Sequence, residues 1–248
     1  MSYLDILNNS QKSLSDENLL WICDLIRKYQ PTNILEVGVS TGGSTAVYLN
    51  CIKDMPNTRL TSIDINDIAF YKEGKPAIGS EVFKVKDQLD LSRFTLKTKF
   101  ITAELDDEKF DFIILDTEHF VPGEILDVLC LKNNIKKGAI IVLDDINIES
   151  RYPNLYKYNL KSTSCNSLLL ASICGTIILP DTDIPEIGAI QVESIDENKL
   201  LLCLCHKWNT DNCDIRYVNK IRKLYGEEFY NRFEKIYQAY RYSNFVGK

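Results

Sequence analysis

The chain has 248 residues, 45% of them hydrophobic and 26% charged, which excludes a disordered or fibrous polypeptide and suits one large α/β domain with or without an appendage. Its net charge of −6 argues against DNA or RNA as the main partner, because phosphate binding favours a basic surface. The first residues lack a secretory pattern, no apolar run is long enough to span a bilayer, and the eight cysteines show no disulfide framework. We therefore expect a cytoplasmic protein with reduced thiols and no membrane partner.

Helix and strand patterns alternate along the first half of the chain, which predicts a parallel sheet covered by helices. Capping residues between Ser13 and Asn18 precede apolar positions at helical spacing, and Pro31 ends that helix. The stretch 66–97 is less regular and is interpreted as a helix plus a basic loop. The other elements expected here are the strands Asn33–Val37, Arg59–Ile65 and Lys99–Ala103 and the helix Thr41–Asn50.

The second half of the chain begins with buried strand patterns and ends with a helix that is rich in Tyr and Phe. Two strand-like segments, Gly188–Glu193 and Leu200–His206, are joined by a short polar junction, which predicts an antiparallel hairpin. The other elements expected here are the strands Phe110–Leu115 and Ala139–Leu143, the helix Gly123–Asn133, a helical segment within 160–174 and the helix Ile215–Tyr240.

A glycine-containing turn follows the first predicted strand. It runs from Glu36 through Gly38, Gly42 and Gly43 to Ser44, and open α/β sheets bind ligands at the carboxyl ends of their strands. A dinucleotide-binding turn requires G-x-G-x-x-G, but Glu36 occupies the place of its first glycine. A P-loop requires a Lys after its last glycine, where this chain has Ser44. Neither phosphate-binding motif therefore fits.

The pattern E-x-G-x-x-x-G-G-S resembles the first motif of class I methyltransferases. The resemblance implies an S-adenosylmethionine site in which Glu36 supports the methionine amino end and the glycines pass beneath the cofactor. Asp64 ends the second predicted strand, where a carboxylate can accept hydrogen bonds from both ribose hydroxyls. Glu104 follows the third predicted strand, where related proteins place a residue near the adenine. The residues expected to bind the cofactor are Glu36, Gly38, Ser40, Gly42, Gly43, Ser44, Asp64, Glu104 and Asp116.

Three carboxylates follow the fourth and fifth predicted strands. Asp116 comes directly after Phe110–Leu115, and Asp144 and Asp145 come directly after Ala139–Leu143. Carboxylates that converge at one edge of a sheet repel one another unless a cation neutralises them. Mg²⁺ favours hard oxygen ligands of this kind. The pattern therefore favours a divalent cation at this edge.

The spacing D-x-x-H after the fourth strand and the run G-x-I-I-V-L-D-D in the fifth resemble the metal-dependent sugar O-methyltransferases. That group includes macrolide and rhamnosyl O-methyltransferases and the cephalosporin hydroxylases, and the resemblance covers about residues 15–150. It implies that Asp116, Asp144 and Asp145 hold Mg²⁺ and that His119 is the catalytic base. Glu118 stands where small residues are frequent in the group, so it either alters the metal shell or points to solvent.

These features predict a Rossmann-like class I methyltransferase fold, with a mostly parallel seven-stranded sheet and an antiparallel C-terminal hairpin. The expected parts are a capping helix (1–30), a cofactor-binding domain (31–206) and a helical extension (207–248). The predicted function is Mg²⁺-assisted O-methyl transfer to a hydroxyl of a sugar, nucleotide sugar or glycosylated metabolite. The alternatives are a metal-independent methyltransferase for another small molecule and a cofactor-binding accessory protein without transferase activity.

The aromatic side chains of the tail have two interpretations. They either bind a sugar through their faces or pack on the domain or on a second copy of the chain, and packing is the more common role of such a helix. Packing on a second copy would make the protein a homo-oligomer through its C-terminal helices. The side chains concerned are Tyr217, Tyr225, Phe229, Tyr230, Phe233, Tyr237 and Tyr240.

Overall fold

The computed structural model describes most of the chain, namely residues 14–151, 163–210 and 212–241. These residues form two compact units. The first contains the residues up to Ile101 and Lys109–Asp116, and the second contains Thr102–Glu108 and the residues from Thr117 onward. The outer parts of the expected N-terminal segment (1–30) and C-terminal extension (207–248) lie outside the described residues.

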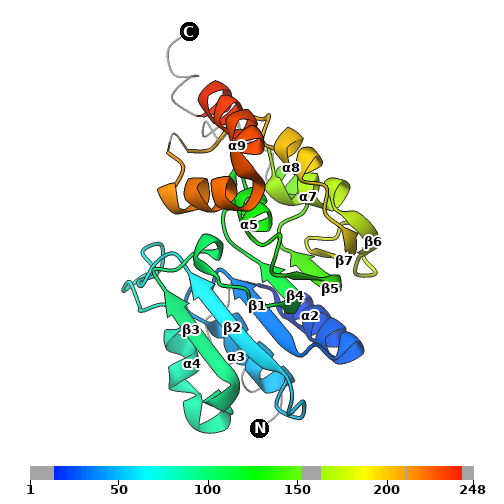
Figure 1. Ribbon diagram of the computed structural model, residues 1–248. Coiled ribbons are helices and arrows are strands. Elements are labelled where there is room, and N and C mark those ends of the chain that lie inside the picture. The colour runs from blue at the N-terminus through cyan, green and yellow to red at the C-terminus, as the bar shows by residue number, and fades with distance from the viewer. Residues whose placement is uncertain (1–13, 152–162, 211, 242–248) are drawn as a thin grey trace. The chain divides into compact units, whose positions relative to one another are not determined.

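The first unit is built on four parallel strands. They are β1 (Asn33–Val37), β2 (Arg59–Asp64), β3 (Phe94–Thr98) and β4 (Phe110–Leu115). The strands lie in the order β3-β2-β1-β4 (Figure 1), with Asn33 opposite Arg59 and Ile34 opposite Phe112. Because parallel strands end at the same edge, Glu36 and Asp64 are brought to one side of this unit. β1 and β4 lie where the sequence predicts them.

Three helices accompany these strands, namely α2 (Asp16–Tyr29), α3 (Gly43–Cys51) and α4 (Ser80–Lys84). The side chain of Ser15 accepts a hydrogen bond from the Asn18 amide and caps α2, and Gln30 ends this helix in the left-handed region, before Pro31. Every residue of α3 is buried, and α3 packs against both α2 and α4. The chain that leaves the glycine turn is therefore enclosed from its first residue.

The third strand lies five residues earlier than predicted. The sequence predicts a strand over Lys99–Ala103, but β3 covers Phe94–Thr98 and pairs with β2. Lys99 has a positive φ of 55°, which ends the extended conformation. Residues Thr102–Glu104 form a short 3₁₀ helix, η3, in the second unit. The residues of β3 are half-buried or exposed, and the strand begins within the stretch interpreted as a helix plus a basic loop, so its pattern gave only a weak strand signal.

The second unit contains three antiparallel strands, β5 (Ile135–Leu143), β6 (Cys174–Ile178) and β7 (Gly188–Ser194). β7 pairs with both β5 and β6. The full strand order is β3-β2-β1-β4-β5-β7-β6. This seven-stranded sheet, with four parallel strands and an antiparallel hairpin, confirms the predicted fold class.

The hairpin uses a different partner strand from the predicted one. The segment Leu200–His206 is not a strand, because Glu197–Cys203 form the helix α8. The Asp196 side chain accepts hydrogen bonds from the Asn198 and Lys199 amides, which is a strong signal for a helix start. The apolar run that follows fits either a buried strand or a buried helix, and here the capping residue decides.

The remaining helices of the second unit are α5 (Gly123–Cys130), α6 (Ile148–Arg151), α7 (Cys165–Ser172) and α9 (Ile215–Tyr240). α9 packs against α5. The Tyr225 hydroxyl donates to the Leu129 carbonyl oxygen at 2.7 Å, and Phe233 is buried beside Trp208. These contacts favour the packing interpretation of the aromatic tail. Within the described part of the chain, no helix combines the length and apolar character that crossing a membrane requires.

Arg93 ties the end of α3 to the beginning of β3. Its guanidinium donates to the carbonyl oxygens of Ile52 and Thr58 at 3.2 Å each and also to that of Met55. Asp90 accepts from Nε of Arg93 at 3.0 Å and fixes the side chain. One side chain of the predicted basic loop thus satisfies carbonyl groups at the end of α3.

We predict that Arg93→Ala lowers the free energy of unfolding by about 2 kcal/mol, because several charge-assisted hydrogen bonds to partly buried carbonyls are lost. Urea denaturation followed by circular dichroism measures the change. Arg59→Ala is the control, since Arg59 is an exposed arginine at the start of β2, and it should change the value by less than about 0.5 kcal/mol. Equal losses in both variants would contradict the role given to Arg93.

Candidate active site

The turn after β1 has a conformation that requires glycine. Gly38 and Gly42 have φ values of 92° and 86°, and Ser40 between them has a φ of 54°, all in the left-handed region that costs energy for other residues. The chain at the start of α4 closes over this turn, since the Gly79 amide donates to the Ser40 carbonyl oxygen at 3.0 Å. A Cβ on Gly42 would lie only 2.7 Å from Cα of Gly79. The turn and this chain segment therefore fit closely.

Asp64 holds the turn in this shape. One oxygen of its buried carboxylate, Oδ2, accepts hydrogen bonds from the backbone amides of Val39 and Ser40 at 3.0 and 3.1 Å. The other oxygen, Oδ1, accepts from the Asn66 amide at 2.9 Å. Each carboxylate oxygen has two lone pairs, so one acceptor position remains, on Oδ1, for one of the ribose hydroxyls that the sequence predicts there.

Glu36 is buried beneath the same turn. Its carboxyl group accepts hydrogen bonds from the hydroxyls of Thr45 in α3 and Ser62 in β2, the latter at 2.5 Å. Burial raises the pKa of Glu36 to about 8, although both hydroxyls act in the opposite direction. The group therefore joins three elements of the first unit and is largely protonated near neutral pH. Its predicted contact with the methionine end of a cofactor stays a prediction.

Ser44 is the residue of this region that most directly indicates a ligand. Its hydroxyl oxygen is buried in the first turn of α3 and has no hydrogen-bond partner among the described residues. Buried polar atoms without partners are rare and call for an explanation. Eight of the nine residues expected to bind the cofactor come together at this edge of the first unit. They are Glu36, Gly38, Ser40, Gly42, Gly43, Ser44, Asp64 and Asp116.

Glu104 does not lie at the end of a strand, as its assignment assumed. It belongs to η3 in the second unit and accepts a hydrogen bond from the guanidinium of Arg216 at 2.6 Å. Arg216 also pairs with Asp214 at 2.8 Å. The placement of Glu104 therefore indicates a link between η3 and α9, and the strand that suggested an adenine contact ends before it.

The loop after β4 carries the expected base. Gly123 allows this loop to close, because a Cβ there would lie 1.9 Å from the carbonyl oxygen of Glu118. The exposed Glu118 side chain accepts a hydrogen bond from the Asn209 amide at 3.2 Å. Glu118 therefore has a partner in the second unit that does not depend on a metal shell.

His119 is half-buried between two carboxylates. Its Nδ1 lies 3.4 Å from Oε1 of Glu124, and its Nε2 lies 3.6 Å from Oδ2 of Asp145. The carbonyl oxygen of His119 accepts from the Cys165 amide at 2.8 Å, and Nδ1 is 3.5 Å from the Asn166 side-chain nitrogen. A backbone hydrogen bond thus fixes His119, and polar groups lie near both ring nitrogens, as a proton-transfer residue requires.

The predicted metal ligands include a compact set. Ligand atoms of His119 and Asp144, which both belong to the second unit, lie within 4.8 Å of each other. Asp145 stands beside them through its contact with His119 and has a positive φ of 50°. Asn166 donates to the Asp144 carbonyl oxygen. Carboxylate oxygens and an imidazole nitrogen are donors that a divalent cation accepts, so the residues fit the predicted ion.

Three buried polar residues of this region were not predicted from the sequence. Glu124 and Asp127 lie in α5, and Asn166 lies in α7. Burial raises the pKa of both Glu124 and Asp127, although nearby hydrogen-bond donors act in the opposite direction. Two acidic residues within the otherwise apolar run Gly123–Cys130 were a detectable signal, because a buried charge requires a partner.

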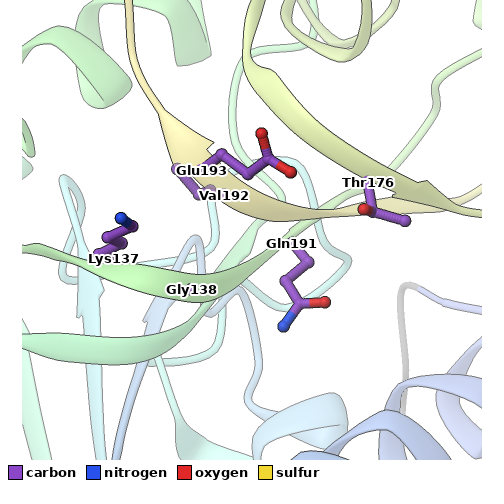
Figure 2. Close-up of a pocket in the computed structure, with 6 residues that line it drawn as sticks. All are labelled: Lys137, Gly138, Thr176, Gln191, Val192 and Glu193. Carbon is purple, nitrogen blue, oxygen red and sulfur yellow. The ribbon is translucent and has the colours of Figure 1, made fainter.

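A cavity of about 310 Å³ lies elsewhere in the second unit. Figure 2 shows that it is lined from three strands, by Lys137 and Gly138 of β5, Thr176 of β6, and Gln191, Val192 and Glu193 of β7. Lys137 and Gly138 lie near the amino end of β5, whereas Asp144 follows its carboxyl end. This cavity is therefore separate from the predicted metal ligands.

We predict that Gly42→Ala lowers the free energy of unfolding by about 3 kcal/mol, from the positive φ and from overpacking against Gly79. Gly74→Ala is the matched control, because Gly74 also has a positive φ but a Cβ there meets nothing within 4 Å. It should lose only about 1 kcal/mol. Chemical denaturation of both variants measures the difference, and similar losses would show that the close approach to Gly79 is unimportant.

The raised pKa of Glu36 predicts a pH dependence of stability. The folded state retains a proton that the unfolded state releases above its ordinary pKa of 4.5, so wild-type stability falls as the pH rises from there to about 8. Glu36→Gln mimics the protonated acid and lacks this loss. Its free energy of unfolding should therefore increase relative to wild type from about pH 5 to about pH 8. Parallel profiles for the two proteins in urea denaturation would contradict the assignment.

Comparison with known proteins places this geometry in a wider group. Residues 35–146 match the model of a family described as a methyltransferase domain. No curated protein matches the chain closely enough to count as a relative. Solved structures match its fold at low sequence identity, and three of them are described next.

The first is the O-methyltransferase TomG from Streptomyces achromogenes, in complex with S-adenosylmethionine. It is 16% identical, with a TM-score of 0.51 over 73% of this chain and 82% of that one. A Podospora anserina methyltransferase bound to S-adenosylhomocysteine is 15% identical, with a TM-score of 0.52 over 77% and 86%. A Bacillus cereus O-methyltransferase is 15% identical, with a TM-score of 0.50 over 76% and 90%. Residues 35–146 are therefore similar to a methyltransferase domain, and the chain shares its fold with solved methyltransferase structures, in agreement with the fold that its sequence predicts.

Proposed function

We propose that this protein is an S-adenosylmethionine-dependent O-methyltransferase that uses Mg²⁺ and transfers a methyl group to a hydroxyl of a sugar or glycosylated metabolite. The observation that carries the proposal is the donor set of His119, Asp144 and Asp145 in the second unit, within a region that is similar to a methyltransferase domain. A cofactor-binding protein without transferase activity would have no use for a basic side chain between two carboxylates. The donor set therefore favours a catalyst.

The turn after β1 is the proposed cofactor site. When bound, S-adenosylmethionine supplies an electrophilic methyl group. Asp64 would accept a hydrogen bond from one of its ribose hydroxyls, and the free hydroxyl of Ser44 would donate to the ligand. The glycines at positions 38 and 42 keep side chains out of the path of the ligand. Solved structures of the same fold are described with S-adenosylmethionine or S-adenosylhomocysteine.

Asp116, Asp144 and Asp145 would hold Mg²⁺, which lowers the pKa of a coordinated hydroxyl and orients it. A sugar hydroxyl is a poor nucleophile near neutral pH. The task of His119 is therefore to accept the hydroxyl proton as the oxygen–carbon bond forms, and Nε2 is the ring nitrogen that faces Asp145. Fixing these groups on one loop and one strand end supplies the orientation that methyl transfer needs.

The finer parts of the proposal rest on the sequence, and among them only the sugar acceptor rests on the family resemblance. They are the sugar acceptor, the domain boundaries at 30 and 206, assembly through the C-terminal helices, and a cytoplasmic location, which agrees with eight free cysteines. Methyl transfer to a panel of nucleotide sugars and glycosides, read by the formation of S-adenosylhomocysteine, tests the acceptor class. Turnover of catechols alone would overturn the sugar assignment.

We predict that a chelator abolishes methyl transfer and that added Mg²⁺ restores it. Asp144→Asn should lower kcat at least about a hundredfold, because a metal ligand is weakened, and His119→Ala should lower it by about 10² to 10⁴. Asp181→Asn is the control, since Asp181 is an exposed acid on a loop of the second unit, and it should behave as wild type. Full activity of Asp144→Asn in chelator would remove the metal from the proposal.

A further inference from the structure

The two edges of the His119 ring each face a carboxylate. Oε1 of Glu124 is 3.4 Å from Nδ1, and Oδ2 of Asp145 is 3.6 Å from Nε2. A neutral imidazole carries one proton, so only one of its nitrogens donates while the other accepts. The carboxylate that accepts a hydrogen bond from this N–H therefore decides which ring nitrogen stays unprotonated and basic.

Glu124 and Asp145 differ in their surroundings. The side chain of Glu124 is fully buried, whereas that of Asp145 is 20% exposed. Oε1 of Glu124 also accepts the Thr117 amide at 3.0 Å, which fixes the carboxyl group beneath the loop that carries His119. Its second oxygen, Oε2, has no hydrogen-bond partner among the described residues. A buried carboxyl group with so few donors gains more from a ring N–H than a partly hydrated one does.

We propose that Glu124 is a positioning residue that accepts the Nδ1–H of His119 and thereby leaves Nε2 as the basic nitrogen. This proposal rests on the proposed function, in which His119 takes the proton of the acceptor hydroxyl. A buried carboxylate that accepts a hydrogen bond from one ring nitrogen fixes both the tautomer and the orientation of the ring. The other nitrogen then carries the lone pair that accepts a proton. Glu124 itself touches no reacting atom.

The Asn166 side chain provides the competing arrangement. Its nitrogen lies 3.5 Å from Nδ1 of His119 and donates to the Asp144 carbonyl oxygen. If it also donated to Nδ1, the ring proton would reside on Nε2 and point to Asp145. The two arrangements therefore differ in one observable, the nitrogen that bears the proton.

Nitrogen-15 NMR of the full chain distinguishes them. The sequence contains only two histidines, His119 and His206, so His206→Gln gives a parent protein with a single imidazole signal. A pH titration identifies the range in which the ring is neutral, and there its two nitrogen shifts report the tautomer. We expect the Nδ1–H form to predominate in this parent. A predominant Nε2–H form would overturn the proposal, whatever the variants do.

Two substitutions of Glu124 test whether this residue sets the tautomer of His119. Glu124→Met removes the acceptor at similar size, and the Nε2–H form should become the major one. Glu124→Gln retains an acceptor oxygen and should keep the Nδ1–H form. Asp127→Asn is the matched control, a second buried acid of α5 that accepts hydrogen bonds from Thr102, Thr117 and Tyr217. It should lower the melting temperature without changing the tautomer. An unchanged tautomer in Glu124→Met would contradict the proposal.

Kinetics supply an independent readout. Glu124→Met should lower kcat about a hundredfold and change the KM for S-adenosylmethionine less than about twofold, because the base is misdirected while the cofactor turn is intact. Glu124→Gln should recover most of the lost rate. Equal rates for Glu124→Met and wild type would contradict the positioning role. A parent protein that transfers no methyl group would count against the proposed function, whereas the NMR measurement still decides the pairing of Glu124 with His119.

Discussion

The hydrogen bonds from the Val39 and Ser40 amides to Asp64 are the constraint on which the rest of the first unit depends. The turn after β1 places Ser40 in the left-handed region, which is unfavourable for a residue with a side chain. A charged acceptor at the end of β2 compensates for that cost. Because the turn is fixed, α3 starts where its first residues are buried, and the segment around Gly79 can close over it. The shape of the proposed cofactor site therefore depends on this one carboxylate.

Buried acids recur in both units and act in the same way. Glu36 joins β1, β2 and α3 through two hydroxyl donors. Asp127 accepts hydrogen bonds from the hydroxyls of Thr102, Thr117 and Tyr217, and so connects η3, the loop after β4 and α9. Replacing one partner of such a group leaves a buried polar atom unsatisfied, which costs more than the hydrogen bond itself contributes. These acids therefore specify one arrangement of their neighbours.

Most of the fold could be predicted from local patterns, and the errors have physical causes. The segments Asn33–Val37 and Phe110–Leu115 are short and mostly apolar, and both are strands with the predicted bounds. The Phe94–Thr98 strand is only half buried, so its pattern resembles a loop. Leu200–Cys203 carries no periodic signal of its own, and only the capping side chain of Asp196 distinguishes helix from strand.

The candidate site likewise contains residues that local patterns predict and residues that only long-range contacts bring together. Residues whose role follows from a strand end, such as Asp64, Asp116 and Asp144, are readable from the sequence, because topology fixes their place. Glu124 and Asn166 reach His119 from two helices, and nothing in their spacing relates them to it. The Glu104 assignment assumed a strand over Lys99–Ala103, whereas β3 ends at Thr98 and Glu104 lies in η3, so its adenine contact stays a prediction. Long-range side-chain contacts of this kind require the folded structure.

The packing of Trp208 has a spectroscopic consequence. The chain contains two tryptophans, and each unit holds one of them. Trp21 lies in α2 of the first unit, and Trp208 is fully buried beside Phe233 and Tyr237 of α9 in the second. Emission from each indole reports its own surroundings, so single-tryptophan versions of the protein would carry a built-in optical probe for either unit. Cooperative and stepwise unfolding of the two units would then be distinguishable without any added label.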